Sequence, residues 1–270
     1  MKGLALFLFC CLLLAPAAVT GADFDYARYA ALLENRVREG VLINRISATA
    51  VDYRGLAKDA GLSTSHYSML LKDLAAFDLN SLKSREERIA FWVNVYNIAA
   101  MKTIVNHYPV DSIRSLKIHW RGSPWGSKVI KVGGRDYSLD EIEHSILLDG
   151  FGELRIHFAI NCASVSCADL LPVPYRAATL YRQLETQGRK LLANREKGMR
   201  IDRERNTVYL SRIFSFDEKR FKAYPGGILA FIKPYVSAAD REYLSRSNPN
   251  IKYLDYDWNA NDLKNVRQGK

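Results

Sequence analysis

The most extended hydrophobic pattern in the 270-residue chain lies between residues 84 and 107. Ser84 and Glu87 have the spacing of a capping box, in which two side chains satisfy free backbone amides of a first helical turn. Apolar residues then follow on nearly every side of the expected helix, and Tyr108-Pro109 ends it. A helix without a broad polar face is typically buried, so this segment is expected at the centre of the fold.

Two amides, Asn94 and Asn97, interrupt this apolar helix three positions apart, and they therefore share one face. A buried amide must be hydrogen-bonded, because leaving its polar atoms unpaired is costly. Two interpretations stay open: the pair ties loops to the core, or it lines a binding site.

Other segments alternate between helical and strand-like patterns. Helical spacing marks residues 25–38 and 66–78, with a polar connector between them. Gly133-Gly134 separates two strand-like runs and predicts a two-residue hairpin. The remaining predicted elements are a capped helix from Ser138 to about Leu148, a helix over 177–193, a hairpin over 200–211, an apolar helix from Gly226-Gly227 to Tyr235, and a closing strand over 251–258.

Helices mixed with hairpins predict an α+β fold rather than a regular βαβ repeat. We expect a helical N-terminal lobe packed on a small mixed or antiparallel sheet. No Pro/Gly/Ser-rich linker, low-complexity segment or clear repeat divides the chain. Residues 23–270 are therefore expected to form a single globular domain.

The N-terminus has the three parts of a secretion signal. Lys2 is followed by an uncharged run from Leu4 to Leu14 and then by small residues, and Asp23 is the first acid. The apolar run is too short for a stable membrane anchor. We expect cleavage of residues 1–22, with Ala22 the preferred site, and a mature protein in the periplasm or outside the cell without integral membrane association.

Composition narrows the range of partners. The formal net charge is +10, and removal of residues 1–22, with one Lys and no acid, leaves +9. The basic residues are scattered among acids, which is typical of a solvated surface and does not favour nucleic-acid binding. We expect a monomer that binds a small molecule or a peptide, without a cofactor.

Candidate chemistry is concentrated between residues 141 and 167. Residues 155–161 alternate in polarity and predict a strand with His157 and Asn161 on one face. The strand runs into Cys162-Ala-Ser-Val-Ser-Cys167, which contains the only cysteines outside the expected signal. The polar or reactive residues of this stretch are Glu141, Glu143, His144, His157, Asn161, Cys162, Ser164, Ser166 and Cys167.

One interpretation of this cluster is thiol catalysis by Cys162. A reactive Cys needs a lowered pKa, supplied by a helix N-terminus or an imidazole. His157 lies about 16 Å from Cys162 along a straight strand, so it qualifies as the base only if the chain turns back. His144 comes from a separate helix, where Asp140 or Glu141 could orient its ring, whereas Glu143 points elsewhere.

Two other interpretations are structural or metal-binding. His144, His157, Cys162 and Cys167 are ligand types suited to zinc, but C-x4-C is wider than the usual zinc pairs, and no metal site is expected. Cys162 and Cys167 could instead form a disulfide in an oxidising compartment, with His157 a satisfied core group.

Familiar catalytic motifs do not resolve the choice. The sequence has no G-x-S-x-G elbow, no H-E-x-x-H pair and no dinucleotide-binding fingerprint. Trp120, Trp125 and Trp258 could line a binding surface, although large aromatic residues more often belong to the core or to its rim.

Four segments resemble a family found in secreted and plant proteins, the domain-of-unknown-function family 547. They are Ala90-Phe-Trp-Val-Asn-Val-Tyr-Asn97, Val132-Gly-Gly-Arg-Asp-Tyr-Ser-Leu-Asp-Glu-Ile-Glu-His144, Ile156-His-Phe-Ala-Ile-Asn-Cys-Ala-Ser-Val-Ser-Cys167 and Tyr253-Leu-Asp-Tyr-Asp-Trp258. The resemblance covers roughly residues 50–260 in order. One departure is Ala168, where the family more often has Pro, so the turn after Cys167 is less fixed.

The resemblance implies a set of site residues but no agreed reaction. The set is Trp92, Asn94, Tyr96, Asn97, Glu143, His144, His157, Cys162, Ser166 and Cys167. Cys, His and amide residues together suggest an analogy with papain- or transglutaminase-like enzymes, at the level of the fold alone.

Two hypotheses follow from the sequence. In the first, the protein is a thiol-dependent hydrolase or acyltransferase acting on peptide or amide bonds, with Cys162 as nucleophile and His144 or His157 as base. Glu143, Asn94 or Asn97 would then orient or polarise the reacting groups. In the second, the protein is a non-catalytic binding module with a Cys162–Cys167 disulfide and a pocket lined by Asn94, Asn97 and Trp258.

Overall fold

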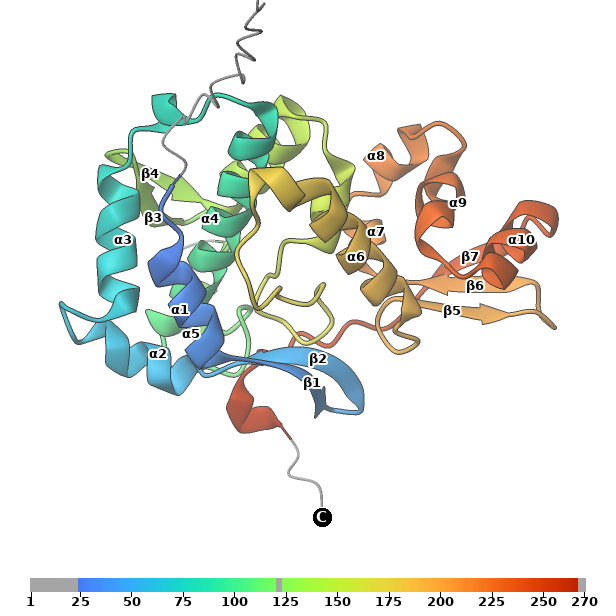
Figure 1. The fold of residues 1–270 in the computed structure, drawn as a ribbon. Helices are drawn as coiled ribbons and strands as arrows, with labels where there is room; N and C mark the ends of the chain where they lie inside the picture. Colours follow the sequence, from blue (N-terminus) through green and yellow to red (C-terminus); the bar gives the residue numbers. More distant parts are fainter. Residues whose placement is uncertain (1–23, 120–122, 267–270) are drawn as a thin grey trace, which may run out of the picture.

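A computed structural model of the chain describes residues 24–119 and 123–266 (Figure 1). The expected signal peptide, residues 1–22, lies outside the described residues, as does Trp120. The fold is α+β as predicted, but its strands form three small sheets in place of a single one, with orders β1-β2, β3-β4 and β5-β6-β7.

Helix α4, Arg85–Val105, is the central element (Figure 1). Its predicted capping box is present, because Ser84 Oγ accepts from the Glu87 amide and the Glu87 carboxylate accepts from the Ser84 amide. Most of its residues are buried, as the absence of a polar face predicted. The N-terminal helices near it are α1 (Ala27–Arg36), α2 (Tyr53–Ala60) and α3 (His66–Ala76), followed by the 3₁₀ turn η1 (Leu79–Ser81).

The polar connector expected between the first two helices is in fact a hairpin followed by α2. Strands β1, Val37–Ile43, and β2, Ile46–Val51, pair antiparallel around Asn44 and Arg45, which both have positive φ. Asn is one of the few residues that tolerate this backbone region, so the turn has a local cause that the hydrophobic pattern does not reveal. Asp52 then caps α2 by accepting from the Gly55 amide.

The glycine hairpin is confirmed. Strands β3, Lys128–Val132, and β4, Arg135–Ser138, pair antiparallel around Gly133 and Gly134, and both glycines have positive φ. The next helix, η2, spans Glu141–Gly150 in the wider π form. Only half of its predicted capping box forms: Ser138 accepts from the Glu141 amide, but the Glu141 carboxylate pairs with Lys128 and Arg135.

The prediction of a strand over 155–161 is wrong. The segment forms a 3₁₀ helix, η3, Leu154–Phe158, whose first turn is capped by the Glu153 carboxylate. Residues 156–161 are all buried, polar and apolar alike, so the alternation in the sequence does not separate a buried face from an exposed one. The main hydrophobic cluster includes Ile156, whereas Phe158 belongs to a second cluster, so this short segment joins the two.

The C-terminal half builds a second lobe around that cluster (right side of Figure 1). Strand β6 pairs antiparallel with β5 and parallel with β7. The predicted helix, hairpin and glycine-led helix of this half are confirmed, and the closing strand is shorter than expected. The elements are η4 (Ala177–Thr179), α6 (Leu180–Ala193), β5 (Met199–Asp202), β6 (Thr207–Leu210), α7 (Ile213–Phe216), α8 (Glu218–Ala223), α9 (Gly227–Ile232), η5 (Lys233–Tyr235), α10 (Ala238–Arg246) and β7 (Asn250–Tyr253).

After β7 the chain returns to the first lobe. Asn261 is the main anchor of this return: its side chain accepts from the Tyr53 hydroxyl and donates to the Thr49 carbonyl. Its own carbonyl accepts from the Val51 amide. The short elements α5 (Leu116–His119) and η6 (Leu263–Asn265) complete the described fold.

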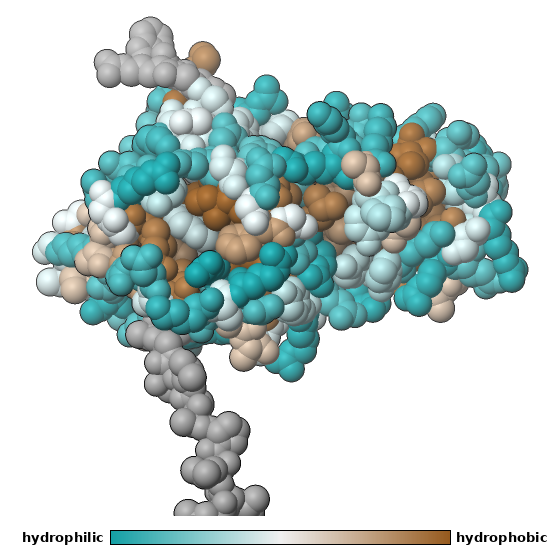
Figure 2. All heavy atoms as spheres, turned by 90° about the horizontal axis from the view of Figure 1, so that it is seen from above, coloured by the Kyte–Doolittle hydropathy of each residue, from teal (hydrophilic) through white to brown (hydrophobic). Residues whose placement is uncertain are grey.

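The surface seen in Figure 2 has hydrophobic residues along its middle and hydrophilic residues towards its edges. Across residues 24–119 and 123–266, no helix is both long enough and apolar enough to cross a membrane.

Candidate active site

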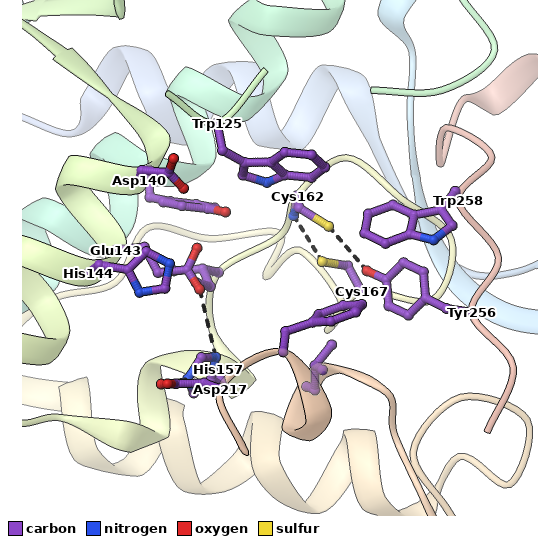
Figure 3. Close-up of a pocket in the computed structure, with 14 residues that line it drawn as sticks. Trp125, Asp140, Glu143, His144, His157, Cys162, Cys167, Asp217, Tyr256 and Trp258 are labelled. Carbon is purple, nitrogen blue, oxygen red and sulfur yellow. Dashed lines mark hydrogen bonds and ion pairs between the residues drawn. The ribbon is translucent and has the colours of Figure 1, made fainter. Parts of the chain in front are cut away.

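A cavity of about 260 Å³ opens where the two lobes meet (Figure 3). Its walls come from α4, η2, η3, the loop after η3, α7 and the segment that follows β7. The lining residues are Tyr96, Trp125, Asp140, Glu143, His144, His157, Ile160, Cys162, Cys167, Ile213, Phe216, Asp217, Tyr256 and Trp258. Cys162, His144, His157 and Glu143, the four residues predicted as catalytic, are all among them.

Cys162 and Cys167 are free thiols that face each other on one side of the cavity (Figure 3). The Cys162 amide donates to Cys167 Sγ at 3.0 Å. The disulfide expected by the binding-module hypothesis is therefore not present in the structure. Both side chains are buried, at 8% and 5% exposure, so a substrate reaches them only through the cavity.

The loop that carries the thiols is fixed at both ends. The Asn161 carboxamide accepts from the Ala163 amide and donates to the Ala168 carbonyl, which closes the loop on itself. Ala163 has a φ of 61°, a conformation that is uncommon outside glycine. A residue keeps this strained conformation only where the surrounding contacts fix its backbone. The loop therefore holds Cys162 in a defined position.

Hydrogen bonding lowers the pKa of Cys162 below its ordinary value. The Cys167 thiol is the main cause, and burial opposes it; Tyr256 and Ser164 stabilise the thiolate further. Tyr256 Oη lies 3.2 Å and Ser164 Oγ 3.6 Å from Cys162 Sγ. Burial, together with the neighbouring Cys162, raises the pKa of Cys167 well above its ordinary value. The two thiols are thus unequal, and Cys162 is the one that ionises.

His157 is held by two carboxylates and not by a thiol. Its Nε2 lies 3.3 Å from Asp217 Oδ2, and its Nδ1 lies 3.9 Å from Glu143 Oε1 (Figure 3). The ring is 5% exposed and packs on Phe221. Asp217 is fixed in turn by Arg220, whose Nε is 3.2 Å away. His157 therefore joins the two lobes at the cavity wall.

His144 lies across the cavity from Cys162, with an exposed ring (Figure 3). Within residues 24–119 and 123–266, no hydrogen bond or ion pair orients this ring, so the predicted support from Asp140 or Glu141 is not found. Glu143 does not bond to the His144 ring either, and its carboxylate faces His157 instead. In the π-helix η2 the backbone bonds run from i to i+5, and Glu143 and His144 both line the cavity.

Asn94 and Asn97 serve as tethers. Asn94 exchanges two hydrogen bonds with the Tyr175 backbone. Asn97 donates to the Ala159 carbonyl and accepts from the Asn161 amide at 2.7 Å. Neither side chain lines the cavity, which favours the first of the two interpretations of this pair. Asn97 still acts on the site indirectly, because it fixes the residue that precedes Cys162.

The other residues expected at the site, as substrate-binding residues, separate into two groups. Tyr96 and Trp258 line the cavity, whereas Trp92 and Ser166 do not. The Trp92 ring packs against Tyr137 in the core. Ser166 Oγ accepts from the Asp257 amide, which places the flanking Tyr256 and Trp258 beside the thiols.

Four lining residues that follow the cysteines in the chain were not predicted as site residues: Ile213, Phe216, Asp217 and Tyr256. Tyr256 lies in one of the segments that resemble the family, whereas the other three lie in none of them. Alternation over 251–258 indicated an ordered segment there, but nothing in the sequence pairs Tyr256 with Cys162.

The ligand set considered for zinc is not assembled. Among the described residues, no group of three or more His, Cys, Asp or Glu side chains is arranged to hold a metal ion. His157 is engaged by carboxylates on the wall opposite the two thiols (Figure 3).

The fold and site together define an α+β protein with two thiols, two histidines and three carboxylates around one cavity. Residues 79–192 match the family described as a protein of unknown function, DUF547, and the chain therefore contains a DUF547 domain. Three of the four resembling segments lie inside this match, and residues 253–258 lie beyond it. No curated protein and no solved structure matches the chain.

Proposed function

We propose that the protein is a thiol-dependent hydrolase or acyltransferase that acts on peptide or amide bonds, with Cys162 as nucleophile. The observation that carries the proposal is the asymmetric thiol pair: Cys162 faces a cavity and has a lowered pKa, while Cys167 remains protonated and donates to it. A thiolate is the nucleophilic form of cysteine.

In the proposed reaction the Cys162 thiolate attacks the acyl carbon, and a C–S bond replaces the C–N bond. Protonated His144, on the opposite wall, gives its proton to the departing amine. Water or an acceptor amine then attacks the thioester, returns a proton to His144 and restores the thiolate. His157, with both ring nitrogens facing carboxylates, positions Glu143 and Asp217 rather than activating Cys162.

The setting of the proposal is a secreted or periplasmic protein that works as a monomer on a small molecule or peptide. The signal-like N-terminus and the absence of a nucleic-acid pattern in the sequence support this setting. The analogy with papain- and transglutaminase-like enzymes is part of the proposal and rests on the residue types alone.

The test uses an activated ester, p-nitrophenyl acetate, and mass spectrometry of the trapped protein. We expect one acetyl group on Cys162 in the native protein and none in Cys162→Ala. Cys167→Ala should still be acylated, but more slowly at neutral pH, because its thiol is the main donor to Cys162. Unchanged turnover of the ester in Cys162→Ala would overturn the proposal.

The competing hypothesis, a binding module with a disulfide, is tested on the same sample. Intact, non-reduced protein lighter by two hydrogens would support the Cys162–Cys167 bridge and argue against the nucleophile. Two thiols that are both alkylated after denaturation would argue for the nucleophile.

A further inference from the structure

The cavity lining is acidic although the whole chain is basic. The formal net charge is +10, yet beside His144 and His157 the charged residues of the lining are the acids Asp140, Glu143 and Asp217, with no Lys or Arg among the described residues. A cavity lined by one sign of charge concentrates ligands of the opposite sign. The lining therefore favours a ligand that carries positive charge.

The three carboxylates are not equally available to such a ligand. Glu143 and Asp217 share His157, and Asp217 also pairs with Arg220. The Asp140 carboxylate has no hydrogen bond or ion pair within residues 24–119 and 123–266, and the Asp140 backbone amide donates to the Trp125 carbonyl. Asp140 is thus the carboxylate of the cavity with capacity for an external cation.

Aromatic rings form the wall next to Asp140. Trp125 lies beside the Asp140 carboxylate (Figure 3) and packs edge-on against Trp258, with ring centres 5.8 Å apart. Tyr256 and Phe216 extend this wall, at 4.3 Å and 5.6 Å from the Trp258 ring centre. Aromatic faces attract ammonium groups, most strongly those of tryptophan. Trp258 already has the Arg114 guanidinium 4.9 Å from its ring centre, which leaves Trp125 as the ring for an incoming cation.

We infer that the site selects acyl substrates carrying a primary ammonium group, bound by Asp140 and Trp125 in the same cavity as the Cys162 thiol. A free peptide amino terminus has this chemistry. That the bound ligand is a substrate rests on the proposed function, whereas the selectivity for an ammonium group is a property of the cavity itself. Asp140 and Trp125 would then determine specificity without taking part in bond cleavage.

The test measures binding in the Cys162→Ala protein, so that it does not depend on catalysis. The probes are alanyl-alanine amide and its N-acetyl counterpart. Their binding is measured by quenching of tryptophan fluorescence and by calorimetry. We expect the free amine to bind about tenfold more tightly, the effect of one hydrogen bond between charged groups. Asp140→Asn should abolish this preference, and Asp136→Asn, an exposed acid on β4 outside the cavity, should retain it.

The outcomes separate the two proposals. Equal binding of both probes, or a preference that survives Asp140→Asn, overturns the ammonium site even if Cys162 is acylated by the activated ester. A preference that Asp140→Asn removes supports the ammonium site even if the native protein is never acylated, in which case only the proposed reaction fails.

Discussion

The reactivity of the Cys162 thiol depends on individual hydrogen-bond donors around its sulfur. Cys167 is the main donor, and the Tyr256 hydroxyl is the next, at 3.2 Å. A hydrogen bond to the charged form of an acid stabilises that form and lowers the pKa. Removing such a donor should therefore leave the fold intact and make the thiolate scarcer at neutral pH.

We predict that Tyr256→Phe slows alkylation of Cys162 by iodoacetamide at neutral pH about tenfold. A hydrogen bond to a charged group contributes about 1.5–3 kcal/mol, and a tenfold change in the alkylation rate corresponds to about 1.4 kcal/mol. The sign follows from the lost donor: the pKa of Cys162 rises, and the rate profile moves to higher pH. The measurement is the alkylation rate against pH, with labelled peptides identified by mass spectrometry.

Tyr253→Phe is the matched control for this prediction. Its hydroxyl lies 3.5 Å from Glu218 and belongs to β7, away from the thiols. It should leave the profile unchanged. If Tyr256→Phe also leaves the profile in place, then the hydroxyl does not stabilise the thiolate, and its proposed share in lowering the pKa of Cys162 is wrong.

At the level of elements, the site depends on how closely α6 packs against η3. Gly188 lies within α6, and a Cβ atom added there would lie 2.8 Å from the Phe158 ring and 3.1 Å from Tyr235. Phe158 directly follows His157, so α6 supports the cavity wall from behind. The glycine is required by this close approach and not by its backbone conformation, because it is an ordinary helical residue.

We predict that Gly188→Ala lowers the free energy of unfolding by about 1 kcal/mol. Alanine adds about 1 kcal/mol of helix propensity, but overpacking typically costs about 1–3 kcal/mol. The measurement is urea unfolding. In a Phe158→Leu background, which frees space for the methyl group, the same substitution should become neutral or stabilising. A stabilising effect in the native background would show that α6 and η3 are not tightly packed.

The elements that the sequence predicted best are those with a local cause. The α4 capping box and the Gly133-Gly134 turn each lie within a few residues, so the chain around them decides the conformation. Residues 155–161 were misassigned because burial on all sides makes alternation uninformative. The π form of η2, which brings Glu143 and His144 to the same cavity, has no signature in the hydrophobic pattern.

At the level of the whole molecule, the site combines segments that only the fold brings together. The cysteines, His144, His157 and Glu143 were identified from residue type and clustering alone. Asp217 and Tyr256 were not, because their partners lie far away in the sequence. Both also lie beyond residues 79–192, so the domain that matches the family supplies only part of the cavity wall.

The core of this protein is rich in buried tyrosines, and they should limit its stability at alkaline pH. Burial raises the pKa of Tyr29, Tyr67 and Tyr175 above the ordinary value. In the unfolded chain a tyrosine ionises near pH 10, so above about this pH the unfolded state loses protons that the folded state keeps. Their contribution to stability is complete below about pH 10 and is lost as the pH rises towards the folded-state values.

We predict that these three tyrosines lower the free energy of unfolding by about 3 kcal/mol between about pH 10 and pH 11, or about 1 kcal/mol each, because a tyrosine of the unfolded chain is already half ionised near pH 10. The phenolate absorbance of these three tyrosines, taken as the difference between the native protein and the matching Tyr→Phe variant, should appear together with the loss of circular dichroism, and not before it. Tyr67→Phe is the informative variant, because the Tyr67 hydroxyl is buried without a hydrogen-bond partner in the described part of the chain. It should change stability little at neutral pH and reduce the fall between about pH 10 and pH 11 by about 1 kcal/mol. If the phenolate absorbance assigned in this way to the three tyrosines develops near pH 10 while the circular dichroism stays native, these side chains are open to solvent, and the core around α1, α3 and α4 is looser than the structure indicates.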